Sequence, residues 1–169
     1  MDIQLLVHYF REYGGIAIFI VVLLEYMNLP GFPSGVIMPL AGIWAAQGNI
    51  GFVPALLLSV LAGLCGSWIL YAAGRVGGPP VLERWVRKFP KHEARISKAV
   101  AFVNEKGYWG VFVGKLIPVV RTLISLMAGV AGMNVVGYTV YSALGIAVWN
   151  FAFMAAGYWF SDAFFHWLQ

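Results

Sequence analysis

Three ionisable side chains stand inside otherwise apolar stretches of the sequence: Glu25, Lys115 and Arg121. A charged group is costly in apolar surroundings, so each of the three is a candidate for a functional role. Lys115 and Arg121 bracket Pro118, and a proline inside an apolar helix frees backbone polar groups. Two cations beside such a break suit a phosphate group. The alternative is that these side chains extend to the nearest polar surface and only anchor their helices.

Polar residues near similar breaks are weaker candidates. Arg75 follows Gly74 at the end of an apolar stretch, where a cation serves either as an anchor or as a ligand-binding group. Hydroxyl groups could donate hydrogen bonds to a phosphate, but they also satisfy carbonyls that are freed in broken helices. The hydroxyl candidates are Ser34, Thr122 and Ser125.

The sequence gives no support for metal or disulfide chemistry. His8, His92 and His166 fall in three separate regions without ligand spacing. The single cysteine, Cys65, cannot form a disulfide within the chain. We therefore predict no catalytic residue, no metal site and no cofactor.

The composition predicts an integral membrane protein. Of the 169 residues, 61% are hydrophobic and 11% are charged, and the mean hydropathy is +0.80. Soluble domains are roughly 45–50% apolar and about 25% charged, so this chain cannot cover itself with a water-compatible surface. The composition argues against a disordered protein, a disulfide scaffold and an ordinary cytosolic enzyme.

The net charge of +4 is concentrated in one segment. The stretch from Arg75 to Lys106 contains eight Lys or Arg residues and three Glu residues. Basic residues that flank membrane spans mark the cytoplasmic side, and they also attract anionic lipid headgroups. We interpret this charge as a signal of topology and lipid contact, and we predict no nucleic-acid partner.

The apolar stretches alternate between short and long. A full membrane span needs roughly 20 residues, so short stretches beside Pro/Gly breaks are typical of re-entrant hairpins that enter and leave on one side. We predict one membrane domain over residues 1–169. Its elements are a first helix (1–29), a re-entrant hairpin (30–50), a transmembrane helix (51–75), a cytoplasmic amphipathic segment (76–107), a second re-entrant hairpin (108–133) and a second transmembrane helix (134–161).

The hairpins are expected to break at Pro and Gly residues. The first group of predicted breaks is Pro30, Pro33, Gly35 and Pro39, and the second is Gly114 and Pro118. Between the repeats, apolar residues fall on one face of a basic helix that would lie in the membrane surface. The residues of this face are Ile96, Ala99, Val100 and Val103.

The order of elements repeats. Ala41-Gly42 matches Ala128-Gly129, and in each half an Ala-Ala-Gly follows, at residues 72–74 and at residues 155–157. With the basic segment in the cytoplasm, the two halves are inverted, the N-terminus is cytoplasmic and the C-terminus is external. Inverted repeats with discontinuous helices are typical of transporters. Labelling of His92→Cys from outside intact cells, in a Cys65→Ala background, would contradict this topology.

Four segments together resemble the DedA family. Residues 112–122 (FVGKLIPVVRT), followed by Ala128-Gly129 and Met133, are similar to its F-x-G-R-x-x-P-x-x-R-T…A-G…M signature. Residues 33–42 (PSGVIMPLAG) resemble its P-S-E-x-x-L-P-x-A-G segment. Residues 66–78 resemble its G…Y-x-x-G-R-x-x-G pattern, and Gly145, Trp149-Asn150 and Gly157-Tyr158 match its last helix.

The resemblance implies two facing re-entrant hairpins in a bacterial inner membrane and a role in lipid translocation. The lipids it implies are undecaprenyl phosphate or phospholipids such as phosphatidylethanolamine. The family's membrane acid corresponds to Glu25 and its second arginine to Arg121. Two positions depart from the pattern: Lys115 replaces the first arginine, which removes a bidentate fork, and Gly35 replaces the first-hairpin acid.

We therefore expect a lipid flippase in the bacterial cytoplasmic membrane, with undecaprenyl phosphate favoured over phospholipids. If the hairpins meet at the midplane, Glu25 approaches Lys115 or Arg121, and a proton on Glu25 would release the cation to the phosphate. Membrane lipids are the predicted partners, and a homo-oligomer is left open. An ion or drug antiporter and a non-transporting scaffold are the alternatives. A lipid phosphatase is disfavoured because Val36 and Thr122 stand where its motifs need His and Pro.

Overall fold

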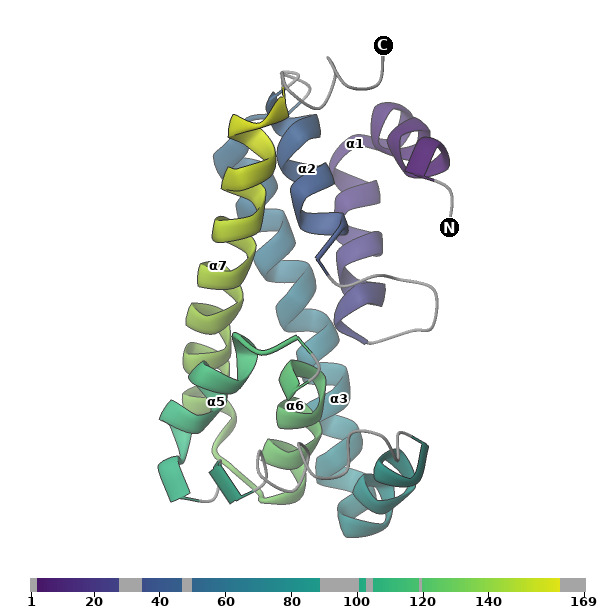
Figure 1. The fold of residues 1–169 in the computed structure, drawn as a ribbon. Helices are drawn as coiled ribbons and strands as arrows, with labels where there is room; N and C mark the ends of the chain where they lie inside the picture. The colour runs from purple at the N-terminus through teal and green to yellow at the C-terminus, as the bar shows by residue number, and fades with distance from the viewer. Residues whose placement is uncertain are drawn as a thin grey trace. The chain divides into compact units, whose positions relative to one another are not determined.

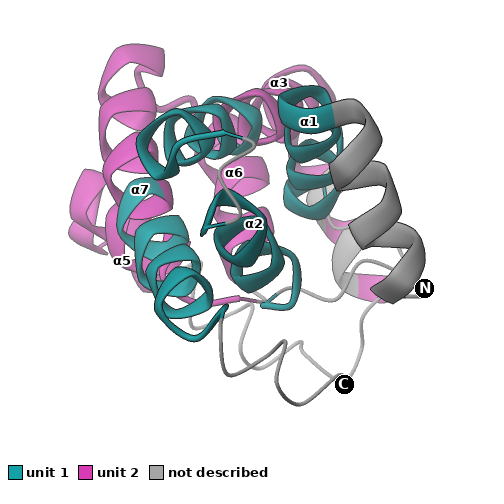
Figure 2. Ribbon diagram, turned by 90° about the horizontal axis from the view of Figure 1, so that it is seen from above, with its two compact units in different colours: residues 1–63, 147–169 teal, residues 64–146 magenta. Residues whose placement is uncertain are grey.

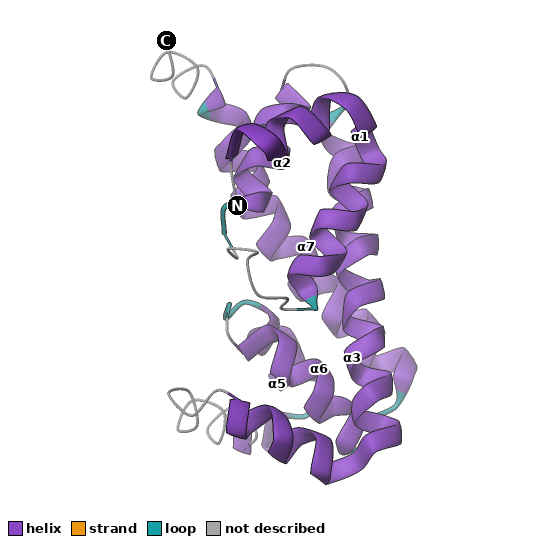
Figure 3. Cartoon of the chain, turned by 90° about the vertical axis from the view of Figure 1, so that its right-hand side faces the viewer, coloured by secondary structure: helices purple, strands orange, loops and turns teal. Residues whose placement is uncertain are grey.

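The computed structural model describes residues 3–27, 35–46, 50–88, 101–102, 105–118 and 120–161. In these residues all regular secondary structure is helical, which confirms the predicted all-α class (Figure 1, Figure 3). The helices are α1 (Ile3–Tyr26), α2 (Ile37–Ala46), α3 (Phe52–Lys88), α5 (Tyr108–Lys115), α6 (Val120–Val130) and α7 (Val135–Trp159).

Among the described residues, two helices are long and apolar enough to cross a membrane. They are the 29-residue part of α3 at Phe52–Pro80 and the 25-residue α7. Both fall where the sequence predicts transmembrane helices. The 10 residues of α2 and the 11 residues of α6 rise only about 15–17 Å, half of a hydrocarbon core that is roughly 30 Å thick.

A glycine with positive φ kinks each of the helices α1 and α3. Gly14 in α1 has φ 53° and Gly78 in α3 has φ 61°, a conformation that is open to glycine and strained for other residues. Gly78 lies directly before Pro79 and Pro80, where the sequence predicts a break. The chain is nevertheless helical again up to Lys88, whereas we expected the transmembrane helix to end at residue 75. The four residues of the predicted amphipathic face, Ile96, Ala99, Val100 and Val103, lie outside the described residues, as do Pro30 and Pro33.

Of the remaining predicted breaks, two lie outside the helices and two lie within them. Gly35, with φ 107°, precedes α2, and Pro118 lies between α5 and α6. The prediction for Pro39 is wrong, because this proline lies in the first turn of α2, where a helix needs no N–H donor. Gly114 lies in the last turn of α5, and its carbonyl accepts a hydrogen bond from the Ile117 N–H at 3.2 Å. Helix α5 therefore ends just after this glycine.

The chain forms two compact units (Figure 2). Unit 1 comprises Met1–Gly63 and Ala147–Gln169, and unit 2 comprises Leu64–Ile146. Unit 1 contains α1, α2, the start of α3 and the end of α7. Unit 2 contains the rest of α3, α5, α6 and the start of α7. Each unit thus combines two other helices with parts of both α3 and α7.

In unit 1, α2 and α7 touch through their backbones at two glycines. A Cβ added to Gly42 would collide with the carbonyl oxygen of Met154, and one added to Gly157 would collide with that of Pro39. A polar network lies beside this contact. The Tyr26 hydroxyl donates to Asn150 Oδ1 at 2.9 Å, and Asn150 Nδ2 donates to Ser59 Oγ at 3.0 Å.

Unit 2 has the same reciprocal contact between α6 and α3. A Cβ added to Gly74 would collide with the Leu126 carbonyl oxygen, and one added to Gly129 would collide with the Tyr71 carbonyl oxygen. In both units each glycine faces the carbonyl of the residue three positions before the partner glycine. The Ala-Gly of each half therefore packs against the Ala-Ala-Gly of the other half, a pairing that the repeat by itself did not predict.

Gly129→Ala and Gly42→Ala are expected to lower the thermal stability of the purified protein. In each case a methyl group must displace a backbone carbonyl, and such overpacking costs about 1–3 kcal/mol or more. Gly51→Ala is the matched control, because its added Cβ would lie 3.4 Å from the Pro54 ring, an ordinary contact. Thermal unfolding in detergent measures the effect, and equal midpoints for Gly129→Ala and Gly51→Ala would contradict the rigid backbone contact.

Candidate functional site

Lys115 ends α5 and is 1% exposed. Its ammonium donates to the hydroxyl oxygen of Ser67 on α3 at 2.7 Å and to that of Ser125 on α6 at 2.7 Å. The same nitrogen lies 5.8 Å from the ring centre of Tyr138 on α7. Four helices of unit 2 thus surround this ammonium, and the alternative that Lys115 extends to a surface is wrong for this structure.

Two glycines create the space for this buried lysine. A Cβ added to Gly145 on α7 would lie 2.6 Å from Lys115 Cβ and 2.9 Å from the Phe112 carbonyl oxygen. A Cβ added to Gly114 would collide with the end of the Ile124 side chain on α6. The absence of both side chains lets α5 lie close to α6 and α7, which buries the lysine stem.

An aromatic pair forms one wall of the site. The Tyr138 ring stacks on the Tyr71 ring with a centroid distance of 4.7 Å. The Tyr138 hydroxyl donates to the Ser67 carbonyl oxygen at 3.3 Å, and the Tyr71 hydroxyl donates to the Met133 carbonyl oxygen at 2.5 Å. Both rings belong to the hydrophobic core of unit 2, whose other members are Val111, Val120, Leu123, Ile124, Met127 and Ala128. This packing holds the wall in place.

Arg121 is the second buried cation of unit 2. It lies in the first turn of α6, is 1% exposed, and is close enough to Lys115 for the two charges to interact. Ser125 links the two residues, because its hydroxyl accepts from Lys115 and donates to the Arg121 carbonyl oxygen at 3.3 Å. Thr122 is buried beside Arg121 on the same helix. The structure therefore brings together four of the predicted site residues.

Arg75 does not join this group. It is exposed, and its guanidinium lies over Gly132, at 2.7 Å from the place where a Cβ would stand. Arg75 follows Ser67 by eight residues on α3, which corresponds to about 12 Å along the helix axis. The structure thus fits a surface anchor better than a ligand to the Lys115 site.

Glu25 belongs to unit 1, where it lies near the end of α1 and is 2% exposed. The expected approach of Glu25 to Lys115 or Arg121 stays a prediction. Ser34 lies outside the described residues. Within the described part of the chain, no three His, Cys, Asp or Glu residues are grouped so that they could hold a metal ion.

Sequence reasoning missed three residues of the site: Ser67, Tyr138 and Gly145. Ser67 lies 48 residues before Lys115. No spacing rule connects positions that far apart. The usable signal was chemical, because a serine and a tyrosine inside apolar helices need hydrogen-bond partners when buried.

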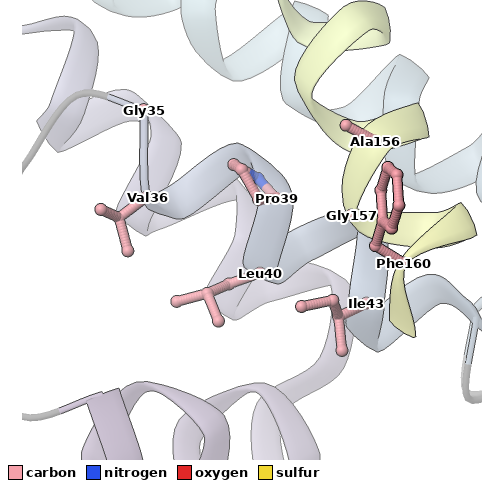
Figure 4. A pocket seen from close by; sticks show the side chains of 8 residues that line it. All are labelled: Gly35, Val36, Pro39, Leu40, Ile43, Ala156, Gly157 and Phe160. Atoms are coloured by element: carbon pink, nitrogen blue, oxygen red, sulfur yellow. The ribbon is translucent and has the colours of Figure 1, made fainter. Parts of the chain in front are cut away.

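Unit 1 carries an apolar groove of about 390 Å³ next to the glycine contact (Figure 4). Its lining comes from the start of α2 and the last turns of α7, and no lining side chain is polar. The lining residues are Gly35, Val36, Pro39, Leu40, Ile43, Ala156, Gly157 and Phe160. This volume lies in the range of small-molecule sites, roughly 300–1,000 Å³, and its chemistry suits a hydrocarbon.

A family model described as the VTT domain matches residues 32–159. The chain belongs to this family, which includes the DedA proteins. The match includes all of α2, α3, α5, α6 and α7, and thus the whole Lys115 site. No solved structure matches the chain significantly.

Relatives of this VTT-domain protein include named transporters. The chain is 34% identical over 165 residues to undecaprenyl phosphate transporter A of Staphylococcus aureus, covering 95% of this chain and 81% of that protein. It is 30% identical to the Bacillus subtilis protein of the same name, covering 86% of this chain and 70% of that protein. It is also 25% identical to an alkaline phosphatase-like protein of Lactococcus lactis subsp. cremoris, covering 91% of this chain and 74% of that protein. The transporter names support a membrane transport role for the family.

Proposed function

We propose that this VTT-domain protein is a flippase of the bacterial cytoplasmic membrane that moves a phosphate-bearing lipid, with undecaprenyl phosphate favoured and phosphatidylethanolamine next. The observation that carries the proposal is the pair of buried cations, Lys115 and Arg121, within one apolar helical unit. A phosphate is the anion that a membrane lipid offers to such a pair. Two relatives named undecaprenyl phosphate transporter A support this choice of lipid.

The two cations have different tasks in this proposal. The Arg121 guanidinium can hold two phosphate oxygens with its planar fork, whereas the Lys115 ammonium acts as a point charge. Both interactions are stronger in apolar surroundings than in water. Thr122 and Ser125 supply hydroxyl groups beside the cations. The hydrocarbon chain of the lipid stays in the bilayer.

Movement of the lipid requires the site to open to each side of the membrane in turn. We propose two inverted repeats, each with a re-entrant hairpin, an N-terminus in the cytoplasm and an external C-terminus. The matching glycine contacts of the two units support a repeat. The short lengths of α2 and α6 support re-entrant hairpins.

A proton is the candidate coupling ion, with Glu25 as its carrier. Glu25 is buried near the end of an apolar helix, and a carboxylate in that position is rarely there without a function. In this proposal the ionised carboxylate competes with the lipid phosphate for the cations. Protonation of Glu25 then frees the cations for the phosphate.

Arg121→Ala is expected to abolish transbilayer movement of undecaprenyl phosphate in reconstituted vesicles, because it removes the bidentate contact. Arg121→Lys should retain partial activity, since it keeps the charge and loses the fork. Arg75→Ala is the matched control, because it removes a cation from the surface of the same unit. Unchanged transport in correctly folded Arg121→Ala protein would contradict the phosphate role.

Glu25→Gln is expected to leave lipid binding intact and to remove its dependence on pH, because the amide keeps the shape and cannot ionise. Transport by the variant should also stop responding to an imposed proton gradient. The measurement is lipid movement at several pH values for both proteins. A pH profile equal to that of the unaltered protein would rule out coupling through Glu25 and would favour a purely anchoring role.

The alternatives make different demands on the same site. Exporters of cationic drugs need a negatively charged pocket, which two buried cations do not provide. A scaffold needs no buried charge, and removal of Arg121 would leave its function unchanged. A phosphatase, as the name of the Lactococcus lactis relative would suggest, would release inorganic phosphate from the labelled lipid, and the vesicle assay can detect that product.

A further inference from the structure

The Lys115 site contains two serines whose side chains point at the same ammonium from different helices. Ser67 on α3 and Ser125 on α6 are both 0% exposed, and each accepts a hydrogen bond of 2.7 Å from Lys115 Nζ. Hydrogen bonds from a charged donor are roughly twice as strong as neutral ones. The two hydroxyls therefore hold the end of a side chain that is otherwise flexible.

The helix packing of unit 2 aligns these serines. Ser67 precedes Gly74 by seven residues and Ser125 precedes Gly129 by four, so each serine lies on the same helix face as its glycine. Gly74 and Gly129 bring α3 and α6 into backbone contact. On α7, Gly145 leaves room for the lysine stem. The position of the ammonium is thus determined from three sides.

We propose that Ser67 and Ser125 are positioning residues that set how Lys115 binds the lipid headgroup. An ammonium has three N–H donors, and the serines use two of them. Lys115 then offers a single donor, aimed at one oxygen of the phosphate, while Arg121 takes two others. This arrangement compensates for the fork that a lysine lacks, because a fixed point charge needs less ordering when the ligand arrives. The inference rests on the proposed function of Lys115 as a headgroup ligand.

The test compares two lipids that differ only in the headgroup. The dissociation constants of undecaprenol and undecaprenyl phosphate are measured for the full chain in nanodiscs. The constant for undecaprenol divided by the constant for undecaprenyl phosphate gives the contribution of the phosphate to affinity. Ser67→Ala and Ser125→Ala are each expected to lower this ratio by about tenfold, the size expected for a lost hydrogen bond to a charged group. Undecaprenol affinity and the thermal midpoint should change little.

The controls separate positioning from structural support. Ser59→Ala alters another fully buried serine of α3 that bonds to Asn150 in unit 1, and it should leave the ratio unchanged. In a Lys115→Met background, Ser67→Ala should have no further effect, because the residue acts only through the ammonium. Additive effects in this double-mutant cycle would overturn the proposal.

The outcomes also distinguish this inference from the proposed function. If Lys115→Met leaves the ratio unchanged, Lys115 does not bind the headgroup, and both ideas fail. If Lys115→Met lowers the ratio while Ser67→Ala and Ser125→Ala behave like Ser59→Ala, the headgroup role stands and the positioning role is refuted. A loss of affinity that is equal for both lipids would assign the serines to fold stability alone and would also refute the positioning role.

Discussion

Direct backbone contact at four glycines is the constraint on which the packing of both units depends. Where Gly42 meets α7 and Gly129 meets α3, no side chain separates the two helices. Such close approach is how apolar helices associate in lipid, where the hydrophobic effect between helices is absent. In unit 2 this contact also places Ser67 and Ser125 on facing helix surfaces. The geometry of the polar site therefore follows from the smallest residues in the chain.

The site shows how a cation can be kept inside an apolar unit. Lys115 is stabilised by two hydroxyl oxygens and by the face of Tyr138, so that its burial is offset by specific contacts. Arg121 adds a second charge nearby. Two like charges repel each other in apolar surroundings, and an anionic ligand would relieve that repulsion. This electrostatic argument leads from the packing to a lipid phosphate as the proposed ligand.

Sequence reasoning predicted the helical class, the two spans and the closeness of Lys115, Arg121 and Ser125, because hydropathy and the break at Pro118 are local signals. Ser67 and Tyr138 could not be assigned to the site, since their partners are distant in the sequence and are selected by tertiary packing. Pro39 was misassigned because a proline starts a helix as readily as it breaks one.

The glycine motifs carried a further signal that sequence alone could not resolve. Ala41-Gly42 and Ala155-Ala156-Gly157 were identified as parts of the repeat, and small residues of this kind let membrane helices approach each other closely. Which face pairs with which depends on the path of the chain between them. The repeat by itself predicted no pairing of its motifs, whereas the structure packs the Ala-Gly of each half against the Ala-Ala-Gly of the other half.

The central claim is that the chain moves a lipid because the lipid carries a phosphate. The most direct measurement follows undecaprenyl phosphate, undecaprenol and phosphatidylethanolamine side by side in vesicles reconstituted with the purified protein. The account predicts that undecaprenyl phosphate crosses the bilayer much faster than in protein-free vesicles and faster than phosphatidylethanolamine. Undecaprenol should cross no faster with the protein than without it. Equal acceleration of undecaprenol and undecaprenyl phosphate, or no acceleration of any lipid, would contradict it.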